Sequence, residues 1–198
     1  MEQINSTLKL ADDRRRPILA MLAFTGMRSG ECRHLQSQDI DFRDNWIHIE
    51  SRDGYETKTG DSRRVPIHPR LLVNLKRFSK RERPWFFTSP ATPKYPDGDH
   101  FINTKKLNEY FLELLKKLEI PAGRDGGFTL HSLRHSFKTL CINSGTPREV
   151  VDAWQGHSPG RSAGSAYYRL GDDESQCFMV KVPFGTGEPP ANGGESES

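Results

Sequence analysis

The chain has 198 residues, 34% of them hydrophobic and 28% charged, which suits one ordinary domain with a sizeable core and a strongly charged surface. No apolar run approaches the ~20 residues that span a bilayer, and the N-terminus lacks the basic-then-apolar order of a secretion signal. The three cysteines, Cys32, Cys141 and Cys177, are far apart and odd in number, which excludes a disulfide framework and a Cys-x-x-Cys metal site. These features predict a cytoplasmic protein in a reducing compartment and no membrane partner.

Charge is distributed unevenly along the chain. The formal net charge is +3, but residues 171–198 hold six acidic residues and one lysine, so residues 1–170 carry +8. A basic body with an acidic C-terminal segment favours a polyanionic partner, and nucleic acid is the first candidate. Scattered surface lysines and arginines are common, so this signal is weak alone.

The first half of the chain predicts two helices followed by two strands. An apolar stripe on residues 18–23 stops at Thr25-Gly26, which ends the first helix. A second, short helix should begin near Ser29 as its N-cap and run to about Leu35. Between Asn45 and Ile67, the runs WIHIES and RRVPIH have the composition of short strands, with turn residues between them.

The second half predicts three helices. Apolar residues keep a spacing of three and four over residues 103–118, the best amphipathic pattern in the chain. A helix over residues 132–143 should end before Gly145. Thr146 to Glu149 form a predicted capping box with Pro147 at the first helical position, opening a helix to about Gln155. The fold class is therefore α+β, mostly helical around one small antiparallel sheet.

The C-terminal part divides into two segments. Residues 178–184, FMVKVPF, are apolar and β-prone. The remainder is rich in Gly, Pro, Ser and Glu and cannot bury enough surface to fold. We expect residues 1–182 to form the folded domain and residues 183–198 to form a disordered acidic tail.

Cationic residues cluster where the chain turns sharply. Arg28 precedes a predicted helix N-terminus, where a planar guanidinium and backbone amides favour an anion. The ordinary alternative is a surface arginine paired with Glu31. His131 and Arg134 are three residues apart on a predicted helix, so one phosphate could meet both, and the alternative is a solvated pair. The chain has seven histidines, but none stands near a cysteine or acid at metal-ligand spacing, so we expect no metal.

Two further segments hold candidates whose ordinary roles are structural. Lys58 lies in the predicted hairpin, where a turn lysine is common. Tyr167 and Tyr168 follow the last predicted helix, where aromatic residues usually pack. Each candidate alone favours its structural role, and only the order and spacing of the whole set points elsewhere.

That set resembles the tyrosine recombinase family, which includes phage integrases, Xer-type resolvases and integron integrases. The family pattern is threonine-glycine-x-arginine with a glutamate three residues on, a hairpin lysine before a Val-Pro strand, histidine-x-x-arginine-histidine, a Gly-His pair and a tyrosine about nine residues later. The match extends over roughly residues 14–170, and its members are Thr25, Gly26, Arg28, Glu31, Lys58, Gly60, Val65, Pro66, His131, Arg134, His135, Gly156, His157 and Tyr167.

The resemblance implies the tyrosine recombinase/integrase catalytic fold and a role for each matched residue. Arg28 and Arg134 would clamp the scissile phosphate of double-stranded DNA, and His157 would donate a further hydrogen bond. His131 would assist proton transfer from the nucleophile. Lys58 would protonate the leaving 5′-hydroxyl, and Tyr167 would form a 3′-phosphotyrosyl link. Glu31 and His135 would support these residues, without a cofactor.

The resemblance also implies assembly and raises alternatives. Members act as homo-oligomers, usually tetramers, on DNA, and the segment after the tyrosine docks onto a neighbouring protomer. Tyr167 lies ten residues after His157, one more than usual, so Tyr168 is an alternative nucleophile. Gln155 stands where the family usually has an aliphatic residue. The N-terminal core-binding domain that normally precedes this one is missing, which suggests an excised domain.

Two other functions fit part of the pattern. A type IB topoisomerase uses nearly the same chemistry on a related fold, but Lys58 in a hairpin and the Gly-His pair suit a recombinase better. A catalytically inactive DNA-binding regulator could keep the fold, but no polar member of the set is replaced. A site-specific recombinase or integrase therefore fits the sequence best.

Overall fold

The computed structural model describes residues 1–57, 60–78, 84–123, 125, 127–157 and 171–184, and within them it has the expected α+β architecture. The helices are α1 (Glu2–Leu10), α2 (Arg16–Thr25), α3 (Ser29–Arg33), the 3₁₀ turn η1 (Ser37–Asp39), α4 (Pro69–Phe78), α5 (Thr104–Lys117), α6 (Leu130–Asn143), α7 (Arg148–Gln155) and α8 (Asp172–Lys181). The strands are β1 (Ile40–Asp41), β2 (Trp46–Ile49) and β3 (Arg63–Pro66). The helices expected over residues 18–25, 103–118 and 132–143 are confirmed.

The three strands form one antiparallel sheet in the order β1-β2-β3. Ile47 pairs with Val65, and Ile49 pairs with Arg63. The two strands expected between Asn45 and Ile67 are therefore confirmed, and β1 was missed because two residues carry no detectable alternation. The pairing places Arg63, the first residue of β3, opposite Ile49 at the end of β2. Strand β3 contacts α7, so Arg63 lies close to the end of that helix.

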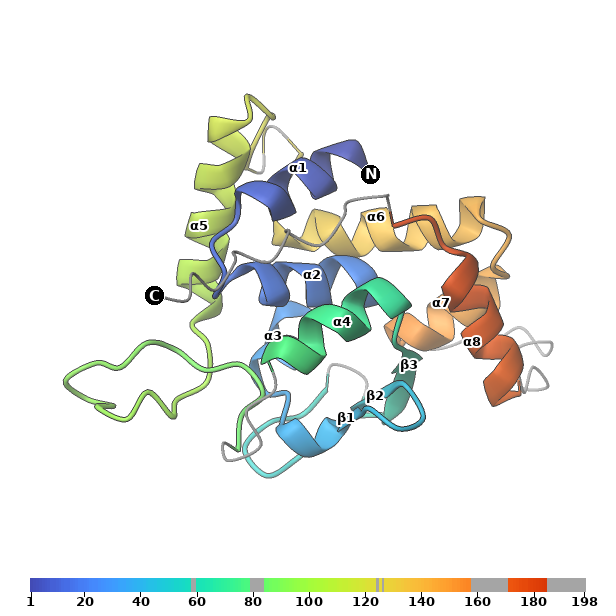
Figure 1. The fold of residues 1–198 in the computed structure, drawn as a ribbon, viewed down its shortest axis with the longest axis horizontal. Coiled ribbons are helices and arrows are strands. Elements are labelled where there is room, and N and C mark those ends of the chain that lie inside the picture. The colour runs from blue at the N-terminus through green and yellow to red at the C-terminus, as the bar shows by residue number, and fades with distance from the viewer. Residues whose placement is uncertain (58–59, 79–83, 124, 126, 158–170, 185–198) are drawn as a thin grey trace, which may run out of the picture.

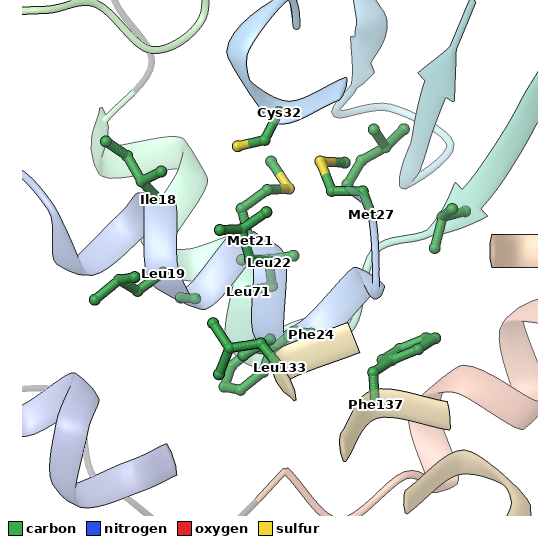
Figure 2. Close-up of a cluster of buried hydrophobic side chains, with 14 of the residues drawn as sticks. Ile18, Leu19, Met21, Leu22, Phe24, Met27, Cys32, Leu71, Leu133 and Phe137 are labelled. Atoms are coloured by element: carbon green, nitrogen blue, oxygen red, sulfur yellow. The ribbon is translucent and has the colours of Figure 1, made fainter. Parts of the chain in front are cut away.

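Helix α2 is the centre of the molecule, with α6 and α4 on either side of it (Figure 1). All of its residues from Pro17 to Thr25 are buried, as expected for a helix that is apolar all round. Its side chains meet Met27, Leu71 and Leu133 in a continuous core (Figure 2). The helix ends at Gly26, which has a left-handed φ of 64°.

The short helix starts at Ser29 as expected, but the N-cap of α3 and the first residue of α6 differ from the expected ones. Residue Arg28, not Ser29, is the N-cap of α3, because the Glu31 carboxylate accepts a hydrogen bond from the Arg28 backbone N–H at 2.6 Å. Helix α6 begins at Leu130, two residues before Ser132, since the Ser132 hydroxyl accepts from the backbone N–H of Thr129. In both helices a side chain three residues into the helix binds the backbone that precedes it.

The predicted capping box before α7 is also wrong. The backbone N–H of Thr146 donates to Cys141 O at 3.0 Å and that of Gly145 to Ile142 O at 3.0 Å, which is a Schellman ending of α6. Thr146 is therefore committed to the end of α6, and Pro147 is the N-cap of α7. The buried Thr146 hydroxyl has no hydrogen-bond partner in the described part of the chain.

The β-prone stretch over residues 178–184 does not form a strand: its first four residues end helix α8, and its last three pack on the domain. Acidic residues fill the first turn of α8, where they favour a helix N-terminus. Met179, Val182 and Phe184 are buried, and the Phe184 ring lies 4.5 Å from the Phe24 ring. The segment thus packs against the core of its own chain. Buried side chains continue to Phe184, and residues 185–198 lie outside the described residues, so the expected boundary between domain and tail stays a prediction.

The cysteines differ in burial but none forms a disulfide. Cys32 and Cys141 are buried, and Cys177 on α8 is exposed. Burial raises the pKa of the Cys32 thiol and raises that of Cys141 to about 12. No helix in the described residues is long and apolar enough to cross a membrane.

Candidate functional site: a buried arginine cluster

A buried carboxylate joins two arginines from distant parts of the chain. Glu31 Oε1 lies 3.0 Å from Arg28 Nη1, and Glu31 Oε2 lies 2.6 Å from Arg63 Nη2. Burial alone raises the pKa of Glu31, but the hydrogen bonds and charges of Arg63 and Arg28 outweigh it, so the pKa lies below its usual value. Glu31 is therefore a carboxylate at neutral pH and fixes both guanidinium groups.

Arg63 was missed by the sequence analysis, although a signal for it exists. It stands two residues before Val65 on β3, so both side chains share one face of the sheet. Val65 is fully buried, which means that Arg63 points into the protein. Its side chain is 7% exposed, and its Nε donates to Trp154 O at 2.9 Å. A Cβ on Gly156 would lie 3.0 Å from the Arg63 side chain, so glycine makes room for it.

Arg134 is the most buried of the predicted cationic residues that the structure describes, at 4% exposed. Its Nη1 donates to Gly26 O at 2.6 Å, and its Nη2 donates to Gln155 O at 2.5 Å. Burial, together with the nearby charge of Arg28, lowers the pKa of Arg134 to about 10, which leaves it a cation at neutral pH. One side chain on α6 thus ties the ends of α2 and α7 together.

Gln155, the residue that departs from the family pattern, completes this tie. It is 1% exposed, and its Nε2 donates to Arg134 O at 2.9 Å while its own backbone oxygen accepts from Arg134. An aliphatic side chain has no N–H group and could not donate this hydrogen bond to Arg134 O. A Cβ on Gly26 would lie 2.4 Å from Phe137 and 2.7 Å from Gln155 Nε2, so the close approach requires glycine there.

His157 follows α7 and has a partner on each ring nitrogen. Its Nε2 lies 3.0 Å from Arg134 Nη2, and its Nδ1 lies 3.0 Å from Asp152 Oδ1. Asp152 also forms ion pairs with Lys138 and, at 3.6 Å, with Arg148. Burial alone raises the pKa of Asp152, but hydrogen bonds from Lys138 and His157 outweigh it and lower the pKa. Asp152 was not singled out from the sequence.

The remaining predicted residues are less well placed. His131 is exposed, one turn before Arg134 on α6, and its ring lies 4.8 Å from the ring of His135. Lys58, Tyr167 and Tyr168 lie outside the described residues, so their roles stay predictions. The structure brings together Arg28, Glu31, Arg134 and His157. It adds two neighbours that the motif did not contain, Arg63 and Asp152.

The cluster is suited to bind an anion. Two guanidinium groups bind the Glu31 carboxylate and that of Arg134 is close enough to feel its charge, which leaves an excess of positive charge. Arginine matches a phosphate with paired hydrogen bonds. Arg28, whose side chain is 22% exposed, is the most accessible of the three. Among the described residues, no three His, Cys, Asp or Glu side chains gather as metal ligands.

Comparisons with known proteins agree with this arrangement. The family model for the phage integrase family matches residues 1–174. A tyrosine recombinase of Thermosipho africanus is 25% identical over 169 residues, covering 85% of this chain and 54% of its own. Tyrosine recombinase XerC of Pediococcus pentosaceus is 31% identical over 146 residues, covering 71% of this chain and 45% of its own. The chain spans about half the length of these curated relatives.

Solved structures share the fold at low identity. The integrase from mycobacterium phage Brujita matches with a TM-score of 0.69 at 17% identity, over 96% of this chain and 59% of that one. The XerA recombinase matches with a TM-score of 0.65 at 20% identity, over 91% and 58%. The fold expected from the motif order is confirmed, and the chain belongs to the phage integrase family.

Proposed function

We propose that this chain is the catalytic domain of a site-specific tyrosine recombinase, which breaks and rejoins double-stranded DNA through a 3′-phosphotyrosyl intermediate. The observation that carries the proposal is the pair of motif arginines, Arg28 and Arg134, fixed beside each other by Glu31, Gly26 and Gln155. Groups held in this way need little rearrangement when a phosphate binds.

The proposed chemistry follows from what phosphoryl transfer requires. Negative charge builds on the phosphate oxygens in the transition state, so positioning and positive charge supply most of the catalysis. Arg28 and Arg134 would provide this charge, and His157 a further hydrogen bond. A tyrosine hydroxyl, with an ordinary pKa of about 10, needs a proton acceptor nearby, and His131 would assist there. Lys58 would protonate the leaving 5′-hydroxyl, and Tyr167 would attack.

The proposed partner is DNA, bound by several copies of the chain. The Tn1549 transposon integrase has been solved in complex with transposon right end DNA, and the XerH site-specific recombinase bound to difH substrate. The charge of +8 on residues 1–170 supports the same partner here. We extend the proposal to a homotetramer on DNA, acting in the cytoplasm.

The test is capture of the covalent intermediate on a nicked DNA duplex that carries the recombination site of this recombinase. Wild type and Tyr168→Phe should form a protein–DNA adduct, and Tyr167→Phe should not. An adduct that survives in Tyr167→Phe and disappears in Tyr168→Phe would assign the other tyrosine. Binding without any adduct would favour the inactive regulator, and relaxation of supercoiled DNA without joining of two sites would favour the topoisomerase.

A further inference from the structure

The ring of His157 carries its proton on a defined nitrogen. Arg134 Nη2 can only donate, so His157 Nε2 accepts that hydrogen bond with its lone pair. Asp152, whose pKa is lowered, is a carboxylate and can only accept, so His157 Nδ1 bears the proton. The two partners together select the neutral Nδ1–H tautomer.

This arrangement occupies donors that a phosphate would need. Arg134 Nη2 has two hydrogens, and they go to Gln155 O at 2.5 Å and to His157 Nε2 at 3.0 Å. His157 Nε2, for its part, has no hydrogen to give. The site as described therefore holds an internal hydrogen bond at the place where both residues would donate to a phosphate oxygen.

The surroundings of His157 allow a proton to arrive and be stabilised. The ring is 41% exposed, so water reaches it. Among the residues that the structure describes, the charged groups facing it are Asp152 from α7 and Arg134 from α6, with Lys138 and Arg148 against the Asp152 carboxylate. In the described part of the chain, the charged neighbours of Arg134 are Arg28, Glu31, Arg63 and Asp152. Asp152 can keep its hydrogen bond with Nδ1 whether the ring is neutral or protonated.

We propose that phosphate binding and proton uptake are coupled at His157, and that Asp152 is the positioning residue that makes the coupling work. When a phosphodiester group of DNA lies against Arg134, Nε2 of His157 takes a proton from solvent and releases Arg134 Nη2. Both groups then donate to the phosphate, while Asp152 accepts from Nδ1 throughout. The inference rests on the proposed function, because it takes a DNA phosphate as the ligand.

The free chain tests the tautomer directly. In ¹⁵N-labelled protein, ring ¹⁵N–¹H correlation spectra should show the Nδ1–H tautomer at His157, with its signals assigned from a His157→Gln variant. Asp152→Ala removes the acceptor and should give a mixture of tautomers. Asp152→Asn keeps an acceptor oxygen and should preserve the wild-type tautomer. Arg148→Ala is the matched control, since it removes a cation that pairs with Asp152 and leaves the contact between Asp152 and His157 Nδ1 intact. An Nε2–H tautomer in the wild type would overturn the inference.

Binding tests the coupling. A short duplex titrated by calorimetry in two buffers of different ionisation enthalpy should show proton uptake by the wild type and by Arg148→Ala. Uptake should be lost in Asp152→Ala and in His157→Gln. Equal uptake in all four would place the proton elsewhere and contradict the coupling. If the duplex does not bind at all, DNA binding in the proposed function fails, and the tautomer of the free chain still decides the arrangement.

Cleavage separates a positioning role from a structural one. Asp152→Ala should cleave roughly tenfold or more slowly at neutral pH, because one hydrogen bond to a charged group is lost. Its rate should recover in part as the pH is lowered, since a more acidic solution supplies the missing proton. A deficit that stays constant across pH would indicate a general loss of structure instead.

Discussion

Arg134 serves both the fold and the proposed chemistry. Its guanidinium donates hydrogen bonds to two buried carbonyl groups, those of Gly26 and Gln155. Lysine has a single nitrogen and cannot reach both. We expect Arg134→Lys to lower the stability by about 1–3 kcal/mol for each carbonyl left unpaired. Cleavage should fall by roughly 10²–10³-fold or more. Urea unfolding beside cleavage of a suicide substrate measures the two effects, with Arg148→Lys as the exposed control. A variant that cleaves at the wild-type rate would remove Arg134 from the site.

Glu31 should make stability depend on acid. Its folded pKa lies below the ordinary value of 4.5, so its contribution is present at neutral pH and is lost as the pH falls through the folded pKa. Glu31→Gln leaves Arg63 without its charged partner in a buried place, which should cost about 3–5 kcal/mol at neutral pH. The difference from wild type should shrink in acid, as measured by thermal unfolding at several pH values. A difference that does not change with pH would show that the charge of Glu31 is unimportant.

At the scale of residues, the sequence predicted the members of the motif and missed Arg63 and Asp152, which contact them. Arg28, Glu31, Arg134 and His157 were found because their spacing is specific. Asp152 was missed because an acid on a helix surface is ordinary, and its role depends on cations that come from α6 and α7. Nothing in the local pattern distinguishes such an acid from a solvated one.

Helix α8 shows what element-level prediction lacked. Its apolar residues have no clear helical periodicity, so the sequence indicated only an apolar, β-prone stretch over residues 178–184 and no helix. Just beyond the helix, Phe184 packs against Phe24 and His68, both more than a hundred residues away in sequence. By contrast, α5 was predicted well because its amphipathic stripe is complete within its own sequence.

The same contacts give an element-level prediction. Phe184 is 1% exposed, and Phe184→Ala should destabilise the domain by about 3–5 kcal/mol through lost burial and a cavity. Val180, 57% exposed on the same segment, provides the control, and Val180→Ala should change stability by less than about 0.5 kcal/mol. Chemical denaturation measures both. If the two variants unfold alike, the segment adds little to the stability of this domain, and docking onto a neighbouring protomer would be its main role.

For the whole molecule, charge should govern DNA affinity. The logarithm of the association constant should fall linearly with the logarithm of salt concentration, with a slope of about −0.9 for each phosphate neutralised. Arg28→Ala should reduce the magnitude of that slope by about one contact. Fluorescence anisotropy with a short duplex at several salt concentrations tests this. Tight binding that is insensitive to salt would contradict a phosphate-dominated interface.

The uneven burial of the three cysteines makes the natural chain ready for site-selective labelling. Cys32 and Cys141 are enclosed, and burial raises the pKa of both thiols, while Cys177 faces solvent on α8. A maleimide dye or spin label should therefore attach quickly at Cys177 alone in the folded protein and at all three thiols after denaturation, as mass spectrometry would count. Rapid modification of Cys32 under native conditions would mean that the core around α2 opens. A label at Cys177 would place an optical or magnetic reporter on the one helix that joins the C-terminal segment to the core.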